Sequence, residues 1–115
     1  MKIVNNNGFK SLVATKQYTK GDIIKKLKGS ILNKPTRTSI EIGTNKHIED
    51  EEGAYINHSF HPNTKIENSS IIAIKDIYEN DHITFNYNEN ETSMKCPFID
   101  SKTGLQVSGK SPKQN

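Results

Sequence analysis

Residues 54–63 contain the side chains of this sequence that are best suited to hold a polar molecule. An apolar start is followed by a polar group that comprises Asn57, His58, Ser59, His61 and Asn63. Pro62 restricts the backbone beside them. Buried amides and imidazoles must find hydrogen-bond partners. The segment is therefore suited either to bind a polar ligand in a fixed place or to form a structural knot that satisfies its own polar groups.

A second segment, residues 83–87, ends in another side chain that could take part in chemistry, Tyr87. Its β-branched and aromatic residues predict a strand. A tyrosine hydroxyl both donates and accepts hydrogen bonds, so Tyr87 is a candidate for direct participation in a reaction, with a plain core tyrosine as the alternative. Phe85 either lines the same site or only packs in the core, as aromatic residues in strands commonly do.

The elements that position these residues are predicted to be short strands separated by turns, which is typical of a mainly β fold. Strands are predicted at residues 12–15, 23–27, 39–43, 47–48, 64–67, 71–74 and 83–87, with turns at residues 19–22, 45–46, 68–70 and 79–81. Residues 30–38 are predicted to be a connector, and no window of the sequence predicts a helix. The acidic run at residues 49–52 is interpreted as a solvated loop.

Length, charge and cysteine content limit the classes of protein to consider. With 115 residues, 31% of them apolar, the chain is expected to form one domain with a thin core. The net charge of +3 allows an acidic partner but does not indicate nucleic-acid binding. No segment approaches the about 20 apolar residues of a membrane span. The single cysteine, Cys96, favours a reducing compartment, excludes a cysteine zinc cluster, and is expected to pack as a small apolar residue.

Two motifs, in their order along the chain, resemble the SET domain, the β-fold of protein lysine methyltransferases. Residues 57–63 read Asn-His-Ser-Phe-His-Pro-Asn, and residues 81–87 read Asp-His-Ile-Thr-Phe-Asn-Tyr. Residues 71–77 between them, and residues 10–24 before them, are similar to the strand and the opening segment that the family has there. The resemblance implies a mainly β, SET-domain β-clip-like fold of several small sheets with a C-terminal pseudoknot.

The resemblance also implies a domain organisation and a type. A SET domain is expected over residues 1–102, and residues 103–115 are expected to be a C-terminal tail that either docks over the cofactor site or is disordered. The chain is similar to minimal, stand-alone SET domains of bacterial or viral type, some of which form homodimers. A protein of this type is expected in the bacterial cytoplasm, or in a host cell or its nucleus, without a classical signal peptide.

The cofactor that the resemblance implies is S-adenosylmethionine, and the implied substrate is a lysine side chain of a protein or peptide, histones included. Tyr87 matches the family's catalytic tyrosine. Asn57 and His58 match the pair that holds the cofactor, and Lys10 and Leu12 match the cofactor loop of the first strand. Neither a membrane nor a direct nucleic-acid partner is expected.

The remaining site residues implied by the resemblance concern the adenine and the lysine channel. Phe98 is the candidate to stack on adenine. Phe85 occupies the position that governs the degree of methylation in the family, and a phenylalanine there implies that more than one methyl group is added. Either Tyr55 or Tyr18 is expected to line the channel. The amine must be neutral to react, so the channel is expected to be apolar and to lower the lysine pKa by desolvation.

The chain also departs from the family pattern. Phe9 and Ser11 occupy positions where the family's cofactor loop has glycines, and Asn86 replaces an acidic residue. The zinc-binding cysteine cluster that often follows the domain is missing, and no metal site is expected; three histidines are not expected to act as ligands, namely His47, His61 and His82. The departures keep an alternative open, a catalytically weakened SET-like binding or regulatory module, whereas the intact motif residues favour the methyltransferase.

Overall fold

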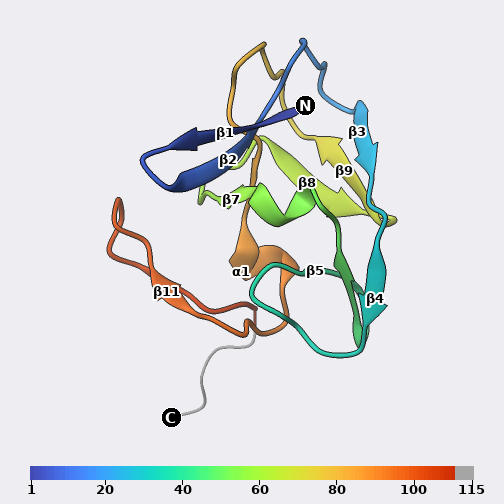
Figure 1. Ribbon diagram of the computed structural model, residues 1–115, viewed down its shortest axis with the longest axis vertical. Coiled ribbons are helices and arrows are strands. Elements are labelled where there is room, and N and C mark those ends of the chain that lie inside the picture. The colour runs from blue at the N-terminus through green and yellow to red at the C-terminus, as the bar shows by residue number, and fades with distance from the viewer. Residues whose placement is uncertain (111–115) are drawn as a thin grey trace.

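The computed structural model describes residues 1–110, which form several small sheets and little helix. The strands are β1 (Lys2–Asn6), β2 (Phe9–Val13), β3 (Ile23–Lys26), β4 (Ser30–Leu32), β5 (Ile40–Gly43), β6 (Lys46–Glu49), β7 (Asn57–His58), β8 (Thr64–Glu67), β9 (Ser70–Ala73), β10 (Thr84–Phe85), β11 (Phe98–Ile99) and β12 (Gln106–Val107). A 3-10 turn, η1 (Gly53–Tyr55), and one four-residue helix, α1 (Tyr87–Asn90), complete the described part. The mainly β fold predicted from the sequence is confirmed (Figure 1).

The N-terminal hairpin pairs β1 with β2 in antiparallel register, from Lys2 opposite Val13 to Asn6 opposite Phe9. Its two-residue turn places Asn7 and Gly8 at φ of 54° and 89°, the left-handed conformations that Asn-Gly hairpin turns favour. The sequence predicted only the second strand, at residues 12–15, because the exposed strand β1 carries no apolar alternation.

The core is formed mainly by the β3–β9–β8 sheet and by the segments that pack on it. Ile71 in β9 and Ile77 after it are fully buried, together with Leu12 of β2. Strands β8 and β9 pair in the register Thr64–Ala73 to Glu67–Ser70, across a turn in which Asn68 and Ser69 both have positive φ. The predicted strands 64–67 and 71–74 are thus confirmed to within one residue.

A second sheet, β4–β6–β5, lies below the first one in Figure 1. Its edge strand β4 was predicted to be part of a connector, and this prediction is wrong: Ser30–Leu32 pairs with Glu49–His47 of β6. All three β4 residues are exposed, so their sequence gives no sign of burial. Gly29 permits the pairing, since a Cβ there would lie 1.8 Å from the Glu49 carbonyl oxygen and its φ is +148°.

The acidic run after β6 is not simply a solvated loop, because Asp50 is only 2% exposed. Its carboxylate accepts hydrogen bonds from Lys25 Nζ at 2.9 Å, from Lys28 N at 2.9 Å and from Gly53 N at 2.8 Å. Burial opposes ionisation of Asp50, but the backbone and lysine hydrogen bonds outweigh it and hold its pKa below the ordinary value. Asp50 therefore fixes η1 against β3 and the approach to β4.

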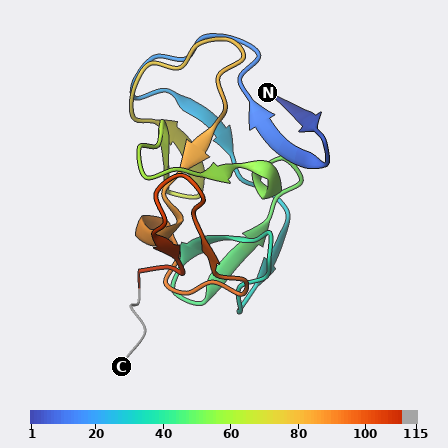
Figure 2. The same cartoon turned by 90° about the vertical axis from the view of Figure 1, so that its left-hand side faces the viewer.

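The pseudoknot consists of β7 and β10, which pair in parallel with Asn57 beside Thr84 and His58 beside Phe85. The predicted strand 83–87 is shorter than expected, because Asn86 ends it and caps α1 by accepting a hydrogen bond from Asn88 N at 2.9 Å. Tyr87 therefore begins a helix instead of ending a strand. After α1, strands β11 and β12 form a hairpin that faces the viewer in Figure 2.

Candidate functional site

Tyr87 lies where α1 meets the pseudoknot. Its hydroxyl donates a hydrogen bond to the Ile56 carbonyl oxygen, and its ring centroid lies 4.8 Å from that of Phe85 and 5.1 Å from that of His58. Burial, with a smaller contribution from the charge of Glu91, raises the pKa of Tyr87 well above its ordinary value. The hydroxyl is therefore neutral, and because its proton is directed at Ile56, its oxygen keeps lone pairs for another group.

His58 presents a buried donor that has no partner among residues 1–110. Its Nδ1 accepts a hydrogen bond from Tyr87 N at 3.0 Å, so in the neutral ring Nε2 carries the proton. Nε2 is buried and unpaired. Burial lowers the pKa of His58 although the charge of Asp100 acts in the opposite direction. A buried unpaired N–H is costly, and a bound ligand with an acceptor atom would satisfy it.

Aromatic rings surround this donor. The centroid of Phe60 lies 4.4 Å from that of His58 and meets it edge to face. Phe98 of β11 is 40% exposed, and its ring centroid lies 6.2 Å from the ring centroids of both His58 and Tyr87. An unpaired donor among aromatic faces suits a planar heteroaromatic ligand. Phe98, predicted to stack on adenine, is thus close to the residues predicted to hold the cofactor.

Asn57 is joined to the first strand pair by a side-chain hydrogen bond, from its Nδ2 to Ser11 Oγ at 2.8 Å. Ser11 is 7% exposed, so the residue that replaces a glycine serves as a buried acceptor. Lys10 Nζ lies 5.5 Å from the ring centroid of Tyr55. Leu12 is fully buried in the core and its carbonyl oxygen accepts from Ile83 N at 2.8 Å.

The second half of the polar segment is a structural knot. Asn63 accepts a hydrogen bond from Thr84 N at 2.9 Å and donates one to the His82 carbonyl oxygen at 2.7 Å. The Thr64 hydroxyl donates to the Thr84 carbonyl oxygen at 2.7 Å. These contacts satisfy the polar groups internally and hold β10 in place. The structural interpretation thus holds for Asn63, whereas ligand binding stays a prediction that concerns His58, the residue of this segment with a buried unpaired nitrogen.

A cavity adjoins the other side of Tyr87. Its lining includes Ile40, Ile56, Phe85, Tyr87, Glu91, Met94 and Cys96. Of the three residues predicted for the lysine channel, only Phe85 lines this cavity. Tyr18 is 8% exposed and pairs with Ile77 in an isolated bridge, and Tyr55 faces Lys10. Cys96 is exposed and free, which corrects the expectation that it packs as a small apolar residue.

The first part of the C-terminal tail docks on α1 through Asn88. Its Oδ1 accepts from Ser108 N at 3.0 Å and from Gly109 N at 2.9 Å, and its Nδ2 donates to the Gln106 carbonyl oxygen at 3.1 Å. Val107 is fully buried. Residues 106–109 thus contact α1, whereas docking of the tail over a cofactor site stays a prediction, and residues 111–115 lie outside the described part. Sequence reasoning missed Asn88, whose only signal was a polar side chain next to a motif residue, and it did not foresee the bond between Ser11 and Asn57.

The sequence of the chain matches the model of one protein family. The model of the SET domain matches residues 10–88. The chain belongs to the SET domain family. That range includes both motifs of the pseudoknot and Ser11 of β2, and it ends one residue after Tyr87.

Solved structures with a similar fold include two of Polycomb Repressive Complex 2. One is a humanized mutant of the Chaetomium thermophilum Polycomb Repressive Complex 2 bound to the inhibitor GSK126, with 16% identity, a TM-score of 0.59, and coverage of 98% of this chain and 19% of that chain. The other is ctPRC2 in an autoinhibited conformation bound to S-adenosylmethionine, with 18% identity, a TM-score of 0.57, and coverage of 92% and 19%. The SET domain chain thus spans about a fifth of the length of either one, and the likeness concerns the fold.

Two further observations are negative. No curated protein matches the chain in sequence. Within residues 1–110, no helix has the length and apolar character needed to cross a membrane.

Proposed function

We propose that this SET domain transfers methyl groups from S-adenosylmethionine to lysine side chains of a protein. The observation that carries the proposal is the pairing of a neutral Tyr87 hydroxyl with a buried, unpaired His58 donor on one side and a cavity on the other. When bound, S-adenosylmethionine supplies a methyl group on a positively charged sulfur. The family membership, and the S-adenosylmethionine bound to ctPRC2 in one of the similar structures, support this choice of cofactor.

The residues on the cofactor side would bind and orient it. The unpaired Nε2–H of His58 donates to an acceptor of the ligand, and Phe98 offers an aromatic face beside it. Asn57 is exposed, and its bond to Ser11 fixes the orientation of its amide. Ser11 takes part in this arrangement, because its side-chain oxygen accepts the hydrogen bond from Asn57.

The residues on the cavity side would prepare the lysine amine. Ile40, Ile56 and Phe85 are nearly fully buried apolar side chains of the cavity wall, and an apolar wall lowers the pKa of an entering amine by desolvation. The Tyr87 oxygen accepts a hydrogen bond there, which positions the amine for attack. A phenylalanine at position 85 places no hydroxyl in the cavity, which leaves room for more than one methyl group.

The test is transfer of labelled methyl groups from S-adenosylmethionine to a histone mixture. Tyr87→Phe should reduce the rate of methyl transfer roughly 100-fold, the usual cost of losing one positioned polar group at a reaction centre. The control Tyr78→Phe changes a tyrosine that is 55% exposed and should leave the transfer rate unchanged. Asn57→Ala should weaken cofactor affinity, measured by calorimetry. Mass spectrometry of the product should show dimethyl- or trimethyl-lysine. A wild-type protein that neither binds the cofactor nor transfers label refutes the proposal.

The second candidate function is a SET-like binding or regulatory module without catalysis. The observation that favours it is Ser11, which occupies a glycine position of the cofactor loop. The two functions differ in one measurement: a module binds S-adenosylmethionine or a lysine peptide but transfers no label to the histone mixture, to a lysine-rich non-histone protein or to itself.

The setting of the protein is part of the proposal. A minimal SET domain of bacterial or viral type would modify a lysine of a host histone or of a non-histone protein, as a homodimer in the cytoplasm or in a host nucleus. Light scattering of the purified protein tests the dimer, and methyl-lysine proteomics of cells that express it identifies the substrate.

A further inference from the structure

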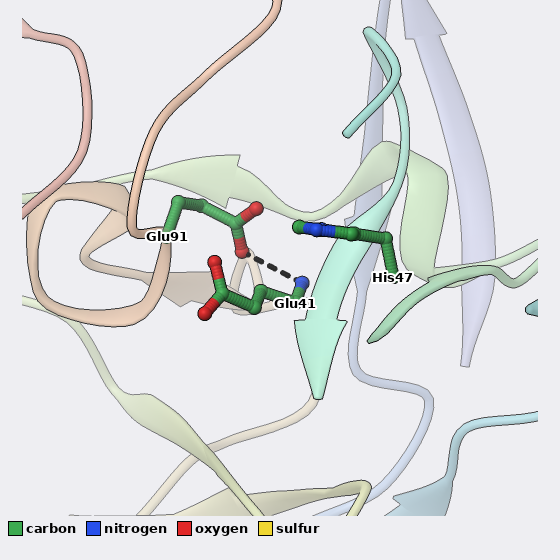
Figure 3. A group of neighbouring side chains, drawn as sticks. All are labelled: Glu41, His47 and Glu91. Carbon is green, nitrogen blue, oxygen red and sulfur yellow. Dashed lines mark hydrogen bonds between the residues drawn. The ribbon is translucent and has the colours of Figure 1, made fainter. Parts of the chain in front are cut away.

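Three side chains from separate elements converge beside α1, away from the contacts that hold the pseudoknot together. They are Glu41 of β5, His47 of β6 and Glu91, the residue that follows α1 (Figure 3). One nitrogen of His47 and one carboxylate oxygen of each glutamate lie within 4.8 Å of one another. His47 is 6% exposed and Glu91 is 5% exposed. Figure 3 shows the His47 ring directed at the Glu91 carboxylate.

His47 supplies an independent sign that something is bound here. Its Nδ1 is buried and has no hydrogen-bond partner among the described residues. No His47–glutamate pair comes within the 4.0 Å of an ion pair, since the ion pairs of residues 1–110 are Lys25–Asp50, Lys25–Glu52 and Lys65–Glu67. A buried imidazole nitrogen and two carboxylates thus face one another across a gap, and within residues 1–110 no cationic side chain forms an ion pair with either carboxylate.

The spacing of these three ligand atoms is close to the spacing of ligand atoms around a bound transition metal ion. Metal bonds of about 2.1 Å to nitrogen and oxygen bring the ligand atoms to within about 4.2 Å of one another. The observed limit of 4.8 Å exceeds this by roughly half an ångström, which small side-chain rotations can close. Without a cation between them, two neighbouring carboxylates repel each other.

Hydrogen bonds already orient both carboxylates. Glu91 Oε2 accepts from Glu41 N at 3.0 Å and from Asn90 Nδ2 at 2.6 Å. The two carboxylate oxygens of Glu41 accept from the backbone N and the hydroxyl of Thr92, each at 2.7 Å. Carboxylates that bind metals are usually held by such outer partners, which fix their orientation. Each Glu41 oxygen accepts one of these bonds and retains a lone pair for an ion, whereas Glu91 Oε2 accepts two, so Glu91 would bind an ion through Oε1.

We propose that Glu41, His47 and Glu91 bind one divalent transition metal ion of the zinc class. One imidazole and two carboxylates suit Zn²⁺, Mn²⁺ or Fe²⁺, whereas Ca²⁺ and Mg²⁺ prefer oxygen ligands alone. The proposal departs from the sequence expectations that there is no metal site and that His47 is not a ligand. Its ligands come from three segments whose proximity depends on the fold, so their spacing in the sequence gives no metal motif.

The ion would act as a structural brace between two parts of the SET domain. Glu41 and His47 belong to the β4–β6–β5 sheet, whereas Glu91 directly follows the helix that Tyr87 begins. The Glu91 carbonyl oxygen also accepts from Lys110 N of the docked tail at 2.6 Å. Metal binding would therefore join the sheet, the helix and the tail at one point. This proposal is independent of the proposed methyl transfer.

The test uses the full-length protein after treatment with a chelator. Calorimetry with ZnCl₂ should show one ion bound per chain. Visible absorption on adding CoCl₂ should also show one ion per chain, with the intense colour of cobalt that has few ligands. MgCl₂ should show no binding. Zinc should also raise the melting temperature. His47→Gln and Glu91→Gln should each weaken zinc binding more than about 100-fold, beyond the usual effect of losing an outer-shell partner.

Matched controls separate this site from surface histidines and from unfolding. His61→Gln removes an exposed histidine that lies outside the cluster and should bind zinc like the wild type. Glu41→Gln changes a half-buried ligand, so it remains informative if His47→Gln or Glu91→Gln fails to fold. The proposal is wrong if the wild type binds neither zinc nor cobalt. It is also wrong if the zinc affinity of folded His47→Gln or Glu41→Gln equals that of the wild type, or if zinc affinity falls only in His61→Gln.

Discussion

Asn88→Ala tests whether the C-terminal tail depends on α1 for its position. The substitution removes three hydrogen bonds, to the backbone of Gln106, Ser108 and Gly109. At about 1 kcal/mol net for each bond, docking should weaken by about 3 kcal/mol, which is roughly a 100-fold increase in the population of the undocked tail. The α1 helix should persist, because its cap is the side chain of Asn86.

Hydrogen exchange is the direct assay for this prediction. The Lys110 amide donates to the Glu91 carbonyl oxygen at 2.6 Å and does not contact Asn88, so its exchange reports tail docking and not merely the lost bonds. It should exchange roughly 100-fold faster in Asn88→Ala, because local opening sets the rate. Glu89→Ala, an exposed residue on the same helix, should leave the rate unchanged. An Asn88→Ala protein whose Lys110 amide keeps wild-type protection refutes this account of the tail.

Three other perturbations test the framework of the fold. Asp50→Asn should cost about 3 kcal/mol in urea unfolding at neutral pH, since it breaks a buried pair with Lys25. Because the pKa of Asp50 is lowered in the folded state, its stabilisation is present above the unfolded-state pKa of about 3.9 and is lost as pH falls further; urea midpoints should decline there in the wild type and less in Asp50→Asn. Gly29→Ala should lower stability by more than about 1 kcal/mol, because the new Cβ meets the Glu49 carbonyl oxygen; equal melting temperatures for Gly29→Ala and Gly43→Ala, whose Cβ meets only ordinary contacts, would contradict this. Asn86→Ala should cost about 1 kcal/mol through loss of the helix cap, and an unchanged thermal midpoint would show that the cap contributes nothing.

The sequence predicted those strands whose residues are buried in a regular pattern. Strand β9 has an apolar run that follows a turn, and its predicted position is nearly correct. Strands β1 and β4 were missed because their residues are mostly exposed, so that only pairing with a neighbour shows them to be strands. The helix was missed because the cap by Asn86 depends on a local backbone bend that a strand-like sequence does not reveal.

The candidate site was predictable to the extent that motifs specify it. His58 and Tyr87 do meet, through a hydrogen bond between Tyr87 N and His58 Nδ1. The directions of the other tyrosines were not predictable, since Tyr18 turns into the core and Tyr55 toward Lys10. Such directions, and the convergence of Glu41 with Glu91, depend on how separate sheets pack.

The parallel pairing of β7 with β10 has a consequence for the order of folding. Two residue pairs join these strands, and the whole β8–β9 hairpin lies between them in the sequence. Closing a long loop costs entropy before its contacts form, so local hairpins should form early and this crossing late. The Tyr87 region should then be the first to open in the native state, with amides of β10 exchanging through a smaller opening free energy than those of β9. Residues that would bind a cofactor thus belong to the least independently stable part of the chain, and ligand binding there would stabilise the last step of folding.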